Sequence, residues 1–598
     1  MRRRASEHRS ERQRARSGAS AESNRVFLRR SAALGLLAVL VLAGCSTVPT
    51  SSPTVQITQA AARPSTDVGI EPLPPEKDAT PDEIVRGFVD AAASTVHGHP
   101  VARKYLSPQA AQSWSDESGI TVITSPSAVT TDTGAVQHDT GAVSLRANEV
   151  GTVDTHGVFS VGTERLYSRS FTLVQVKGQW RISDPPDGLL LQEPDFERLY
   201  DDREAYFIDP TGQRLVPDPR YLITGESQPT TLVQRLLDGP SSALADGVRN
   251  PLAGAQLRRA VTVTPRTVTV DLSGVGNQPA PVLSEICAQI VWTLAQLSLA
   301  NVEVLLDGQP VDVDGVPTVQ NTSDWESFDP EGVPVGSVGL YVDKGAVRTA
   351  SNGKPIPGAA GTGKYALSSA AVATDPKSGD PDTMAGVSSV GGRATLRVGQ
   401  YGKDLASVLV GNTLTAPTVA ATREEFWVVR DGAAVFRVSA GGQPQAVAAP
   451  SLPGLGHVSS LRLSPDGVRA AVVIDGTIYV GTVVRSGDGV SLHNLQAIAP
   501  SLTLVADVAW DSSATLLALA GDASQQRMVP YQIGIDGFGL EPVATSGLPG
   551  QPTAIGAVPG RQPLVSAGGT IWQQSGGTWV TLIRGQEPLP GRAPFYPL

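Results

Sequence analysis

The sequence predicts a multidomain chain with an α+β region, an α/β region and a large all-β region built from repeated sheets. Three observations lead to this fold class. Glycine (62) and proline (46) are abundant and aromatic residues make up only 5% of the 598 residues, which is typical of many short strands joined by turns. Helix-like and strand-like patterns both occur up to about residue 320. Beyond that point one strand pattern recurs at a constant spacing.

The first 44 residues have the features of a bacterial export signal. Ten arginines and three glutamates give this segment a charge of +7. The uncharged run of thirteen residues Ala32–Gly44 follows. In a helix this run would rise about 20 Å, which is short of the ~30 Å hydrocarbon core of a bilayer. A cleaved secretory signal is therefore favoured over a permanent span, and twin-arginine export at Arg29-Arg30 is a weaker alternative because Ser31-Ala32 follows.

The end of this segment, Leu42-Ala43-Gly44-Cys45, resembles the bacterial lipobox. The resemblance implies cleavage between Gly44 and Cys45, and lipidation of Cys45 by S-diacylglycerol and an N-acyl chain. Two or three acyl chains anchor a protein stably, whereas one binds only marginally. We therefore expect a lipoprotein signal peptide at residues 1–44 and a mature protein held by Cys45 at the extracytoplasmic face of the cell membrane.

Residues 45–80 are expected to form a lipidated, proline-rich tether. Seven prolines occur between residues 46 and 81, among Ser, Thr and Ala. Such a composition favours an extended chain without a core, with a reach of at most about 100 Å.

Residues 81–199 are predicted to form an α+β domain. Thr80 and Glu83 have the spacing of a capping box, and Pro81 suits the first helical position. One apolar helical face follows: Ile84, Val85, Phe88 and Val89. After about residue 120 alternating patterns predict antiparallel strands, with a turn at Lys177-Gly178. The succession of helices and sheet resembles a cone-shaped NTF2-type domain.

Residues 200–322 are predicted to form an α/β domain. AYFIDPTGQRLVP predicts a hairpin, PTTLVQRLLDGP a helix, and the stretch around Pro265 two strands. A long helix through Cys287 and the strand NVEVLLDG complete the order. This order resembles a GerMN domain, which implies an envelope-facing binding module rather than an enzyme.

Residues 323–598 contain an internal repeat. VSSLRLSPDGVRAAVV (458–473), VADVAWDSSATLLALA (505–520) and PTAIGAVPGRQPLVSA (552–567) align without gaps at an offset of 47 residues. Each unit has room for four short strands with Asp-Gly turns, which is the spacing of a β-propeller. Five blades fit residues 335–598, and six remain possible.

The charge and the scattered reactive side chains exclude several classes of function. The chain carries −10, so the part beyond residue 44 carries about −17 and repels nucleic acid. Cys287 is interpreted as a buried hydrophobe, and Asp238 and Asp271 as structural residues at turns.

Other apparent motifs are also interpreted as structural. Gly358–Lys364 resembles a phosphate-binding loop, but Tyr365 stands where Ser or Thr is needed, so a flexible Gly-rich loop is expected. His97 and His99 have no acidic partner at ligand spacing and are expected to be exposed. Three tryptophans are expected in the propeller core rather than in a glycan groove: Trp427, Trp510 and Trp572. We predict no catalytic residue, cofactor or metal site.

The order of lipobox, tether, α+β domain, GerMN-like domain and propeller resembles the LpqB lipoprotein family of actinobacterial envelopes over essentially the full length. The resemblance implies an accessory lipoprotein that binds the sensor domain of a two-component histidine kinase (MtrB-like) and modulates its signalling. Of the family's functional residues only the lipidated cysteine corresponds, at Cys45. Two alternatives stay open: an enzyme, and a passive binder of cell-envelope glycan or a small ligand.

Overall fold

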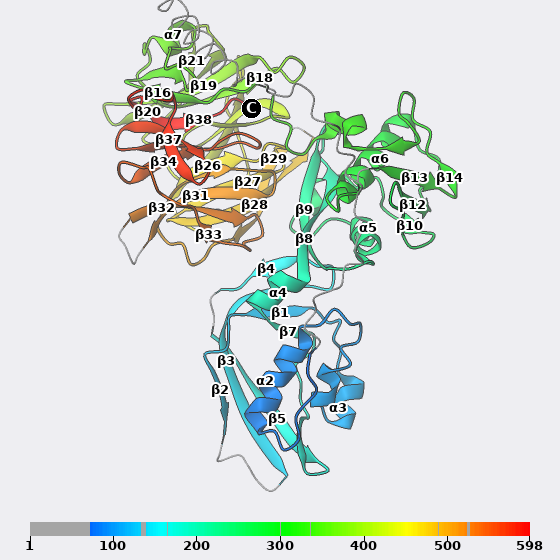
Figure 1. Cartoon of the computed structure of the whole chain (residues 1–598). Coiled ribbons are helices and arrows are strands. Elements are labelled where there is room, and N and C mark those ends of the chain that lie inside the picture. Colours follow the sequence, from blue (N-terminus) through cyan, green and yellow to red (C-terminus); the bar gives the residue numbers. More distant parts are fainter. Residues whose placement is uncertain are drawn as a thin grey trace, which may run out of the picture. The chain divides into compact units, whose positions relative to one another are not determined.

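Three folded regions follow one another in the part of the chain that the structure describes. This computed structural model describes residues 72–598, apart from 133–138, 164–165, 300, 335, 488 and 523–526 (Figure 1). The order of an α+β region, a mixed α/β region and an all-β region agrees with the sequence prediction. The predicted signal peptide lies outside the described residues, and so does the tether up to residue 71.

The first region is an antiparallel sheet packed against a helix. Its helices are α2 (Pro81–Ala92), η1 (Ala102–Tyr105), α3 (Pro108–Ser113) and α4 (Glu193–Leu199). Its strands are β1 (Ile120–Ile123), β2 (Ala128–Thr131), β3 (Thr140–Val153), β4 (Phe159–Val161), β5 (Leu166–Val176), β6 (Gln179–Ile182) and β7 (Leu189–Gln192). The main sheet order is β6-β5-β3-β1-β7, in which only β1 and β7 run parallel, and β2 and β4 pair with β3.

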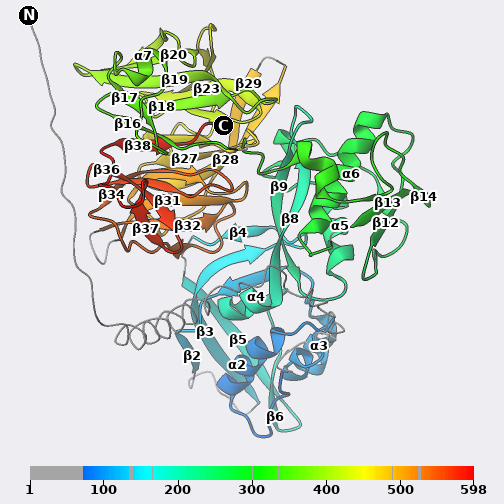
Figure 2. The same ribbon diagram turned by 45° about the horizontal axis from the view of Figure 1, so that its top comes forward.

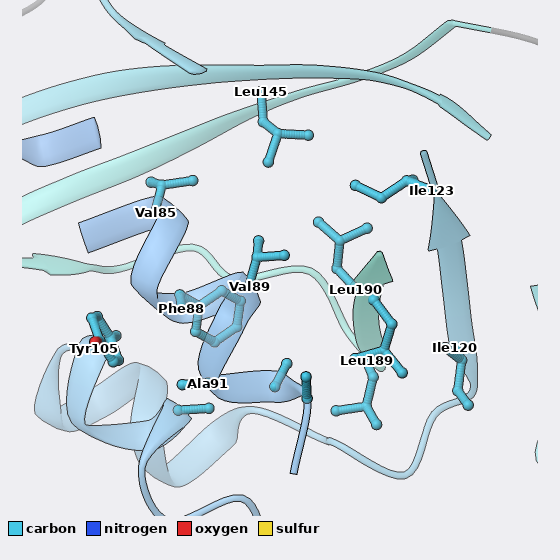
Figure 3. Close-up of a cluster of buried hydrophobic side chains, with 14 of the residues drawn as sticks. Val85, Phe88, Val89, Ala91, Tyr105, Ile120, Ile123, Leu145, Leu189 and Leu190 are labelled. Carbon is cyan, nitrogen blue, oxygen red and sulfur yellow. The ribbon is translucent and has the colours of Figure 1, made fainter. Parts of the chain in front are cut away.

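Helix α2 begins where the sequence predicts. The Thr80 N–H donates to Glu83 Oε2 at 2.7 Å, and Pro81 opens the first turn, where its missing N–H costs no helical bond. Figure 3 shows Val85, Phe88 and Val89 pointing from α2 toward side chains of the sheet. These side chains are almost completely buried, which contributes about 1.5–3 kcal/mol each. This shared core holds the helix on the sheet.

The second region has three layers: a hairpin, two helices and a sheet (Figures 1 and 2). The hairpin is β8 (Tyr200–Ile208) and β9 (Leu215–Ile223), and the helices are α5 (Gln228–Asp238) and α6 (Ala280–Ala295). The sheet has the order β10-β12-β13-β14, and β11 pairs with β12 and β15 with β13. Strands β12 and β13 pair in parallel, and α6 connects them in the sequence. Its strands are β10 (Gln256–Leu257), β11 (Thr262–Val263), β12 (Val268–Ser273), β13 (Val302–Leu306), β14 (Gln309–Pro310) and β15 (Val319–Gln320). The region also contains two short 3-10 helices, η2 (Ala245–Gly247) and η3 (Thr322–Phe328). One core joins the layers through Phe207 of the hairpin, Leu236 of α5, Ile286 of α6 and Val270 of β12.

The third region consists of six small antiparallel sheets in the described residues. Four-stranded sheets are formed by β18 (Leu367–Thr374), β19 (Pro381–Val390), β20 (Arg393–Gln400) and β21 (Ala406–Gly411), and by β22 (Thr418–Ala420), β23 (Arg423–Arg430), β24 (Ala434–Ser439) and β25 (Gln445–Ala446). The third four-stranded sheet contains β26 (Val458–Leu463), β27 (Arg469–Ile474), β28 (Thr477–Ser486) and β29 (Gly489–Ala497). The fourth contains β30 (Val505–Trp510), β31 (Thr515–Asp522), β32 (Arg527–Gly534) and β33 (Glu541–Pro542). The last four-stranded sheet is β34 (Pro552–Gly556), β35 (Leu564–Ala567), β36 (Thr570–Ser575) and β37 (Thr578–Thr581).

The remaining sheet brings together the two ends of this region. Strands β16 (Leu340–Asp343) and β17 (Ala346–Thr349) pair with β38 (Arg592–Phe595), and the short helix α7 (Gly358–Gly361) follows β17. Five of the sheets in the described part of this region are thus four-stranded, and the sixth is built from segments far apart in the sequence.

The predicted repeat register is confirmed. Strands β26, β30 and β34 begin at Val458, Val505 and Pro552, at the predicted offset of 47 residues. Each of these strands also has a register shift at its second residue, where it pairs with the next strand. A β-bulge at the same place in each unit changes the direction in which the following side chain points. The residues that follow are Ser460, Asp507 and Ala554.

Candidate functional site

The predicted lipidation and cleavage residues, Cys45 and Gly44, lie outside the described residues. Their role therefore stays a prediction. Between residues 72 and 598, none of the described helices combines the length and the apolar character that a membrane span requires.

One strand of each of the six sheets borders a cavity of about 260 Å³ in the propeller-type region. The cavity is lined by segments of β18, β22, β26, β30, β34 and β38. At the beginning of these strands Ser459 and Thr553 are exposed, whereas Leu463 and Trp510 at the other end are buried. Solvent therefore reaches the cavity from the side where the strands begin.

Asp507 is the main charged group in this cavity. It is 8% exposed, its Oδ1 accepts from Ser460 Oγ and Arg462 Nη2 at 3.1 Å each, and its Oδ2 accepts from the Ile555 N–H at 3.2 Å. The Trp510 indole N–H donates to the Arg462 carbonyl at 3.1 Å. Because these groups satisfy one another, the lining joins three repeats and presents no free acid–base pair.

The β8–β9 hairpin forms a contact with the propeller-type region. Pro217 and Pro219 lie at positions of β9 that face away from β8, so their missing N–H groups cost no ladder bond. The carbonyl of Pro217 accepts from Arg469 Nη2 at 2.6 Å. Nearby, Thr482 Oγ1 and Asn494 Nδ2 donate to the Ala243 carbonyl at 2.7 and 3.0 Å.

Gly247 allows this contact to be close. It is buried in η2, and a Cβ atom on it would lie 2.5 Å from Thr482 Cγ2 and 2.9 Å from Val468 Cγ1. Real Cβ atoms do not approach so closely, and both neighbours are short β-branched side chains with little freedom to move. Any side chain larger than hydrogen at Gly247 would therefore force the two regions apart.

An aromatic cluster joins all three folded regions. Phe538, in the turn after β32, lies 5.1 Å from Phe159 of β4, 5.4 Å from Phe196 of α4 and 5.3 Å from Tyr221 of β9, between ring centroids. All three contacts are edge-to-face, which is a favourable geometry for aromatic pairs. The segment between the second and third regions adds a polar contact, in which Glu331 accepts from Ser513 Oγ at 2.7 Å.

Next to this cluster lies a group of acidic side chains with incomplete hydrogen bonding. Glu204 Oε2 and Asp536 Oδ2 are buried and have no hydrogen-bond partner among the described residues. Arg469 is 6% exposed; its Nη1 is also without a partner, and no carboxylate of the described residues lies within 4.0 Å of its guanidinium. The junction, defined here as Asp202, Glu204, Tyr221, Arg469 and Asp536, is therefore electrostatically strained.

Burial shifts the proton affinities of the junction. It raises the pKa of Glu204 well above its usual range, with Asp202 adding to the effect and Arg469 opposing it. Burial also raises the pKa of Asp536, although the Phe538 N–H, which donates to its Oδ1 at 3.0 Å, and the Tyr221 hydroxyl work against it. Asp202 keeps an exposed surface at the rim. Its pKa is raised to about 7, mainly by partial loss of hydration and to a lesser extent by repulsion from Asp536.

A neighbouring buried ion pair has several hydrogen bonds, although Arg220 Nε has no partner in the described residues. Arg220 Nη2 donates to Asp218 Oδ2 at 2.9 Å, and both side chains are at most 4% exposed. Ser241 adds an N–H at 2.6 Å and a hydroxyl at 2.9 Å to the same carboxylate. This pair therefore serves the fold, in contrast to the unpaired groups beside it.

The structure corrects the expectation for His99. This histidine is 8% exposed, and its Nδ1 lies 2.8 Å from Asp116 Oδ2, while Arg103 Nη2 donates to Asp116 Oδ1 at 2.6 Å. Burial alone would raise the pKa of Asp116, but the hydrogen bond from His99 and the charge of Arg103 lower it overall. His97 is exposed, as expected.

The region around His99 also has a cavity of about 620 Å³ between β1, β9 and α5. Its lining includes Asp154, Tyr200 and Arg235. His99 Nε2 is buried and has no partner in the described part of the chain.

The three residues that the sequence analysis interprets as structural, Cys287, Asp238 and Asp271, are buried or form hydrogen bonds within the fold. Cys287 is fully buried, and burial raises the pKa of its thiol to about 12. Asp238 accepts from Arg235 Nη1 at 2.7 Å at the end of α5. Asp271 accepts from the Gly308 N–H at 3.0 Å and holds the turn after β13.

The Gly-rich stretch, for which the sequence predicts a flexible loop, is helical over four residues. It forms the short helix α7, and Lys364 Nζ donates to Asp404 at 3.0 Å. The Tyr365 hydroxyl accepts from the Leu405 N–H at 2.9 Å. Trp427 and Trp510 are buried in the core as predicted, and Trp572 is partly buried.

Sequence reasoning missed the junction residues. Glu204, Arg469 and Asp536 look like ordinary strand or turn residues, and only the fold brings them together from two regions. Within the described ranges, no group of three or more His, Cys, Asp or Glu side chains is placed to hold a metal ion.

Family models match the three folded regions in the same order. Residues 74–197 match "Lipoprotein LpqB, N-terminal domain", residues 204–312 match "Sporulation and spore germination" (Germane), and residues 345–597 match "Lipoprotein LpqB beta-propeller domain" (Gmad1). None of these descriptions is of an enzyme.

Relatives extend the similarity over most of the chain. Lipoprotein LpqB of Rhodococcus jostii (strain RHA1) is 31% identical over 552 residues, covering 87% of this chain and 90% of the relative. Lipoprotein LpqB of Nocardia farcinica is 30% identical over 572 residues, covering 89% and 92%. Lipoprotein LpqB of Mycolicibacterium smegmatis is 31% identical over 484 residues, covering 75% and 79%.

Solved structures resemble only parts of the chain. The β-propeller domain of Cps50 (Swd1) from Myceliophteria thermophila is 15% identical, covering 40% of this chain and 79% of that one, at a TM-score of 0.28. The tandem GerMN domains of GerM from Bacillus subtilis are 22% identical, covering 21% and 47%, at a TM-score of 0.18. The assignment therefore depends on the family models and the full-length relatives. By these, the chain belongs to the LpqB lipoprotein family.

Proposed function

We propose that this protein is an extracytoplasmic accessory lipoprotein that binds the sensor domain of a two-component histidine kinase (MtrB-like) and modulates its signalling. The main observation in support is that the polar groups of the propeller cavity satisfy one another around Asp507. A cavity of this kind offers structure and surface, not acid–base chemistry. The kinase partner itself comes from the family resemblance.

The membrane anchor is part of this proposal. Cleavage between Gly44 and Cys45 would leave the mature chain held by lipids on Cys45, with residues 45–80 as the tether. A tether confines the folded regions to a layer at the membrane, where a kinase sensor domain is also found. Confinement raises the effective concentration of the two partners by orders of magnitude, so a weak interface suffices.

The proposal includes the absence of catalytic turnover. In the two cavities described above, Asp507 is paired with Arg462 and Asp116 with Arg103, so these carboxylates have structural partners. The buried thiol of Cys287 is protonated at neutral pH because burial raises its pKa to about 12, and a thiol is a poor nucleophile.

A binding experiment on vesicles tests the proposal. The lipidated chain and the kinase with its sensor domain are placed in the same vesicles, and their association is measured by fluorescence energy transfer. We expect saturable association that weakens about a hundredfold or more when Cys45→Ala protein is added from solution instead. No association on shared vesicles, at any lipid-to-protein ratio, would contradict kinase binding.

The alternative of a glycan or small-ligand binder is favoured by one observation, the cavity of about 620 Å³ beside His99. Its carboxylates, the Arg235 guanidinium and Tyr200 are groups that bind hydroxyl-rich molecules. Calorimetric titration with soluble cell-envelope glycan fragments tests this alternative. Binding that His99→Ala weakens, together with a failed kinase experiment, would favour it.

We also propose the finer features of the fold and its boundaries. The helix-covered sheet of residues 81–199 is of the NTF2-like type, and residues 200–322 form the GerMN-like domain. Residues 323–598 form a propeller whose six sheets act as six blades, with β38 completing the sheet of β16 and β17.

A further inference from the structure

We infer that the contact between the propeller and the β8–β9 hairpin is a proton-controlled latch, in which Glu204 and Asp536 are protonated in the docked state and their ionisation at higher pH weakens docking. The inference concerns how the folded regions are held together, and it does not depend on which partner the protein binds.

The first argument is the position of the two carboxyl groups. Glu204 belongs to the hairpin and Asp536 to the turn after β32, so they approach each other only when the propeller is docked. Glu204 Oε2 and Asp536 Oδ2 are buried, and neither has a hydrogen-bond donor within the described ranges. Both residues are partly exposed, and Asp536 Oδ1 accepts from the Phe538 N–H at 3.0 Å, so the two oxygens Oε2 and Oδ2 are the atoms left without donors. When both groups are ionised these oxygens carry charge that nothing bonds, whereas neutral carboxyl groups do not repel each other.

The second argument is the charge balance around them. The ionisable groups that face Glu204 and Asp536 are Asp202 and Tyr206 of β8, Asp218 and Tyr221 of β9, and Arg469 of β27. The charge of Arg469 also acts on the buried Asp466, in the turn before β27. Asp218 already holds Arg220 in an ion pair at 2.9 Å. Arg203 acts on Asp202 but donates to Asp201 at 2.8 Å. Arg469 is then the one cation left that acts on both Glu204 and Asp536, and it forms no ion pair with any described carboxylate within 4.0 Å. One such cation does not balance three acidic side chains.

The direction of the pH effect follows from the raised pKa values of Glu204 and Asp536. When the propeller separates, both groups regain water and their pKa values return toward about 4. The docked state therefore binds more protons than the separated state between these two pKa ranges. Docking is fully favoured at low pH and is lost progressively as pH rises through the raised values, by up to about tenfold per pH unit for each proton released.

The experiment measures docking by single-molecule energy transfer in the full chain, purified in detergent. Dyes are attached at Leu166→Cys in the first region and Val390→Cys in the propeller, two exposed positions. The native cysteines do not interfere, because Cys287 is buried and Cys45 is the predicted lipid site. The ratio of separated to docked molecules is recorded between about pH 5 and about pH 8.

Three variants make the result interpretable. Gly247→Val gives the reference for separated molecules, because a side chain there collides with Thr482 and Val468. The double variant Glu204→Gln, Asp536→Asn keeps both side-chain shapes and removes both titrations. Asp380→Asn removes an exposed propeller carboxylate away from the junction and serves as the matched control.

We expect the ratio in the unmodified protein to rise at least tenfold over this pH range, and Asp380→Asn to behave in the same way. The double variant is expected to stay docked throughout. The single variants Glu204→Gln and Asp536→Asn are each expected to retain part of the pH dependence, and their circular dichroism melts check that they fold.

Three results would overturn the latch. The first is a ratio that does not change with pH in the unmodified protein. The second is a double variant with the unmodified pH dependence, which would assign the titration to other groups. The third is a folded double variant that is separated at every pH, which would mean that the ionised carboxylates hold the propeller in place.

Discussion

Ser460 Oγ donates a hydrogen bond to Asp507 Oδ1 over 3.1 Å, and the two residues occupy the same position in consecutive repeats, 47 residues apart. The other oxygen of Asp507 accepts from the Ile555 N–H of the next repeat at 3.2 Å. A single carboxylate thus connects β26, β30 and β34. The first of these bonds spans 47 residues and the second 48, so the repeat spacing brings the three strands within reach of one carboxylate.

Replacing this carboxylate should destabilise the propeller. Asp507→Ala leaves the Arg462 guanidinium, the Ser460 hydroxyl and the Ile555 N–H without their shared partner, so we expect a loss of about 2–4 kcal/mol in the free energy of unfolding. Urea denaturation followed by circular dichroism measures it. Glu541→Ala, at an exposed position of β33, is the control and should change stability by less than about 0.5 kcal/mol. An equally small effect of Asp507→Ala would contradict the linking role.

The propeller core should lose stability in acid through Glu425. This carboxylate accepts from Arg437 Nη1 at 2.9 Å, from the Trp427 indole at 3.1 Å and from Arg485. Burial alone would raise the pKa of Glu425, but Arg485 and Arg437 lower it overall. Its stabilising effect is therefore present above the unfolded pKa of about 4.3 and is lost as pH falls through the lower folded value.

Denaturation midpoints at several pH values test this acid sensitivity. Glu425→Gln should be less stable than the unmodified protein at neutral pH, and the difference should shrink below about pH 4. A stability difference that is constant over the whole range would show that the charge of Glu425 is not responsible.

Removing the aromatic ring at the three-region contact should loosen the hairpin and α4. Phe538→Ala removes three edge-to-face contacts, which we expect to cost about 3 kcal/mol, mostly in docking. Hydrogen exchange followed by mass spectrometry should show faster exchange in residues 196–223, with unchanged protection in β26 and β30. Val580→Ala, at a position 38% exposed, should leave exchange unchanged. Uniformly faster exchange throughout the propeller would indicate that Phe538 stabilises the blade itself.

Loss of the predicted lipid site should release the protein. Mass spectrometry of the mature amino terminus is expected to show acylated Cys45 without residues 1–44, and Cys45→Ala protein should move to the soluble fraction. Retention of Cys45→Ala protein in washed membranes would require another anchor.

Local patterns predicted much of this fold, because their causes are local. Lys177 and Gly178 both have positive φ values, 54° and 77°, as the predicted tight turn requires. The Thr80–Glu83 capping bond and the 47-residue register also depend on neighbouring residues and on repetition. Such signals can be recognised without knowing the rest of the fold.

Features that depend on distant residues could not be predicted in this way. His99 lies 17 residues from Asp116, and only the folded loop brings the pair within 2.8 Å. The junction needs Glu204 and Asp536 from different regions, each with an unremarkable sequence around it. The sheet that contains β38 was not expected as a separate unit, because Arg592–Phe595 is short and contains Pro594.

The pairing of β38 with β16 makes the propeller a ring that closes late. Strand β16 is synthesised long before the four-residue strand Arg592–Phe595, so its sheet is complete only after that strand has been made. As the chain emerges the other sheets can form in order, while Leu340–Asp343 keeps an open edge. Open strand edges pair readily with other chains. The interval between the appearance of β16 and that of β38 is therefore when the nascent protein is most exposed to aggregation.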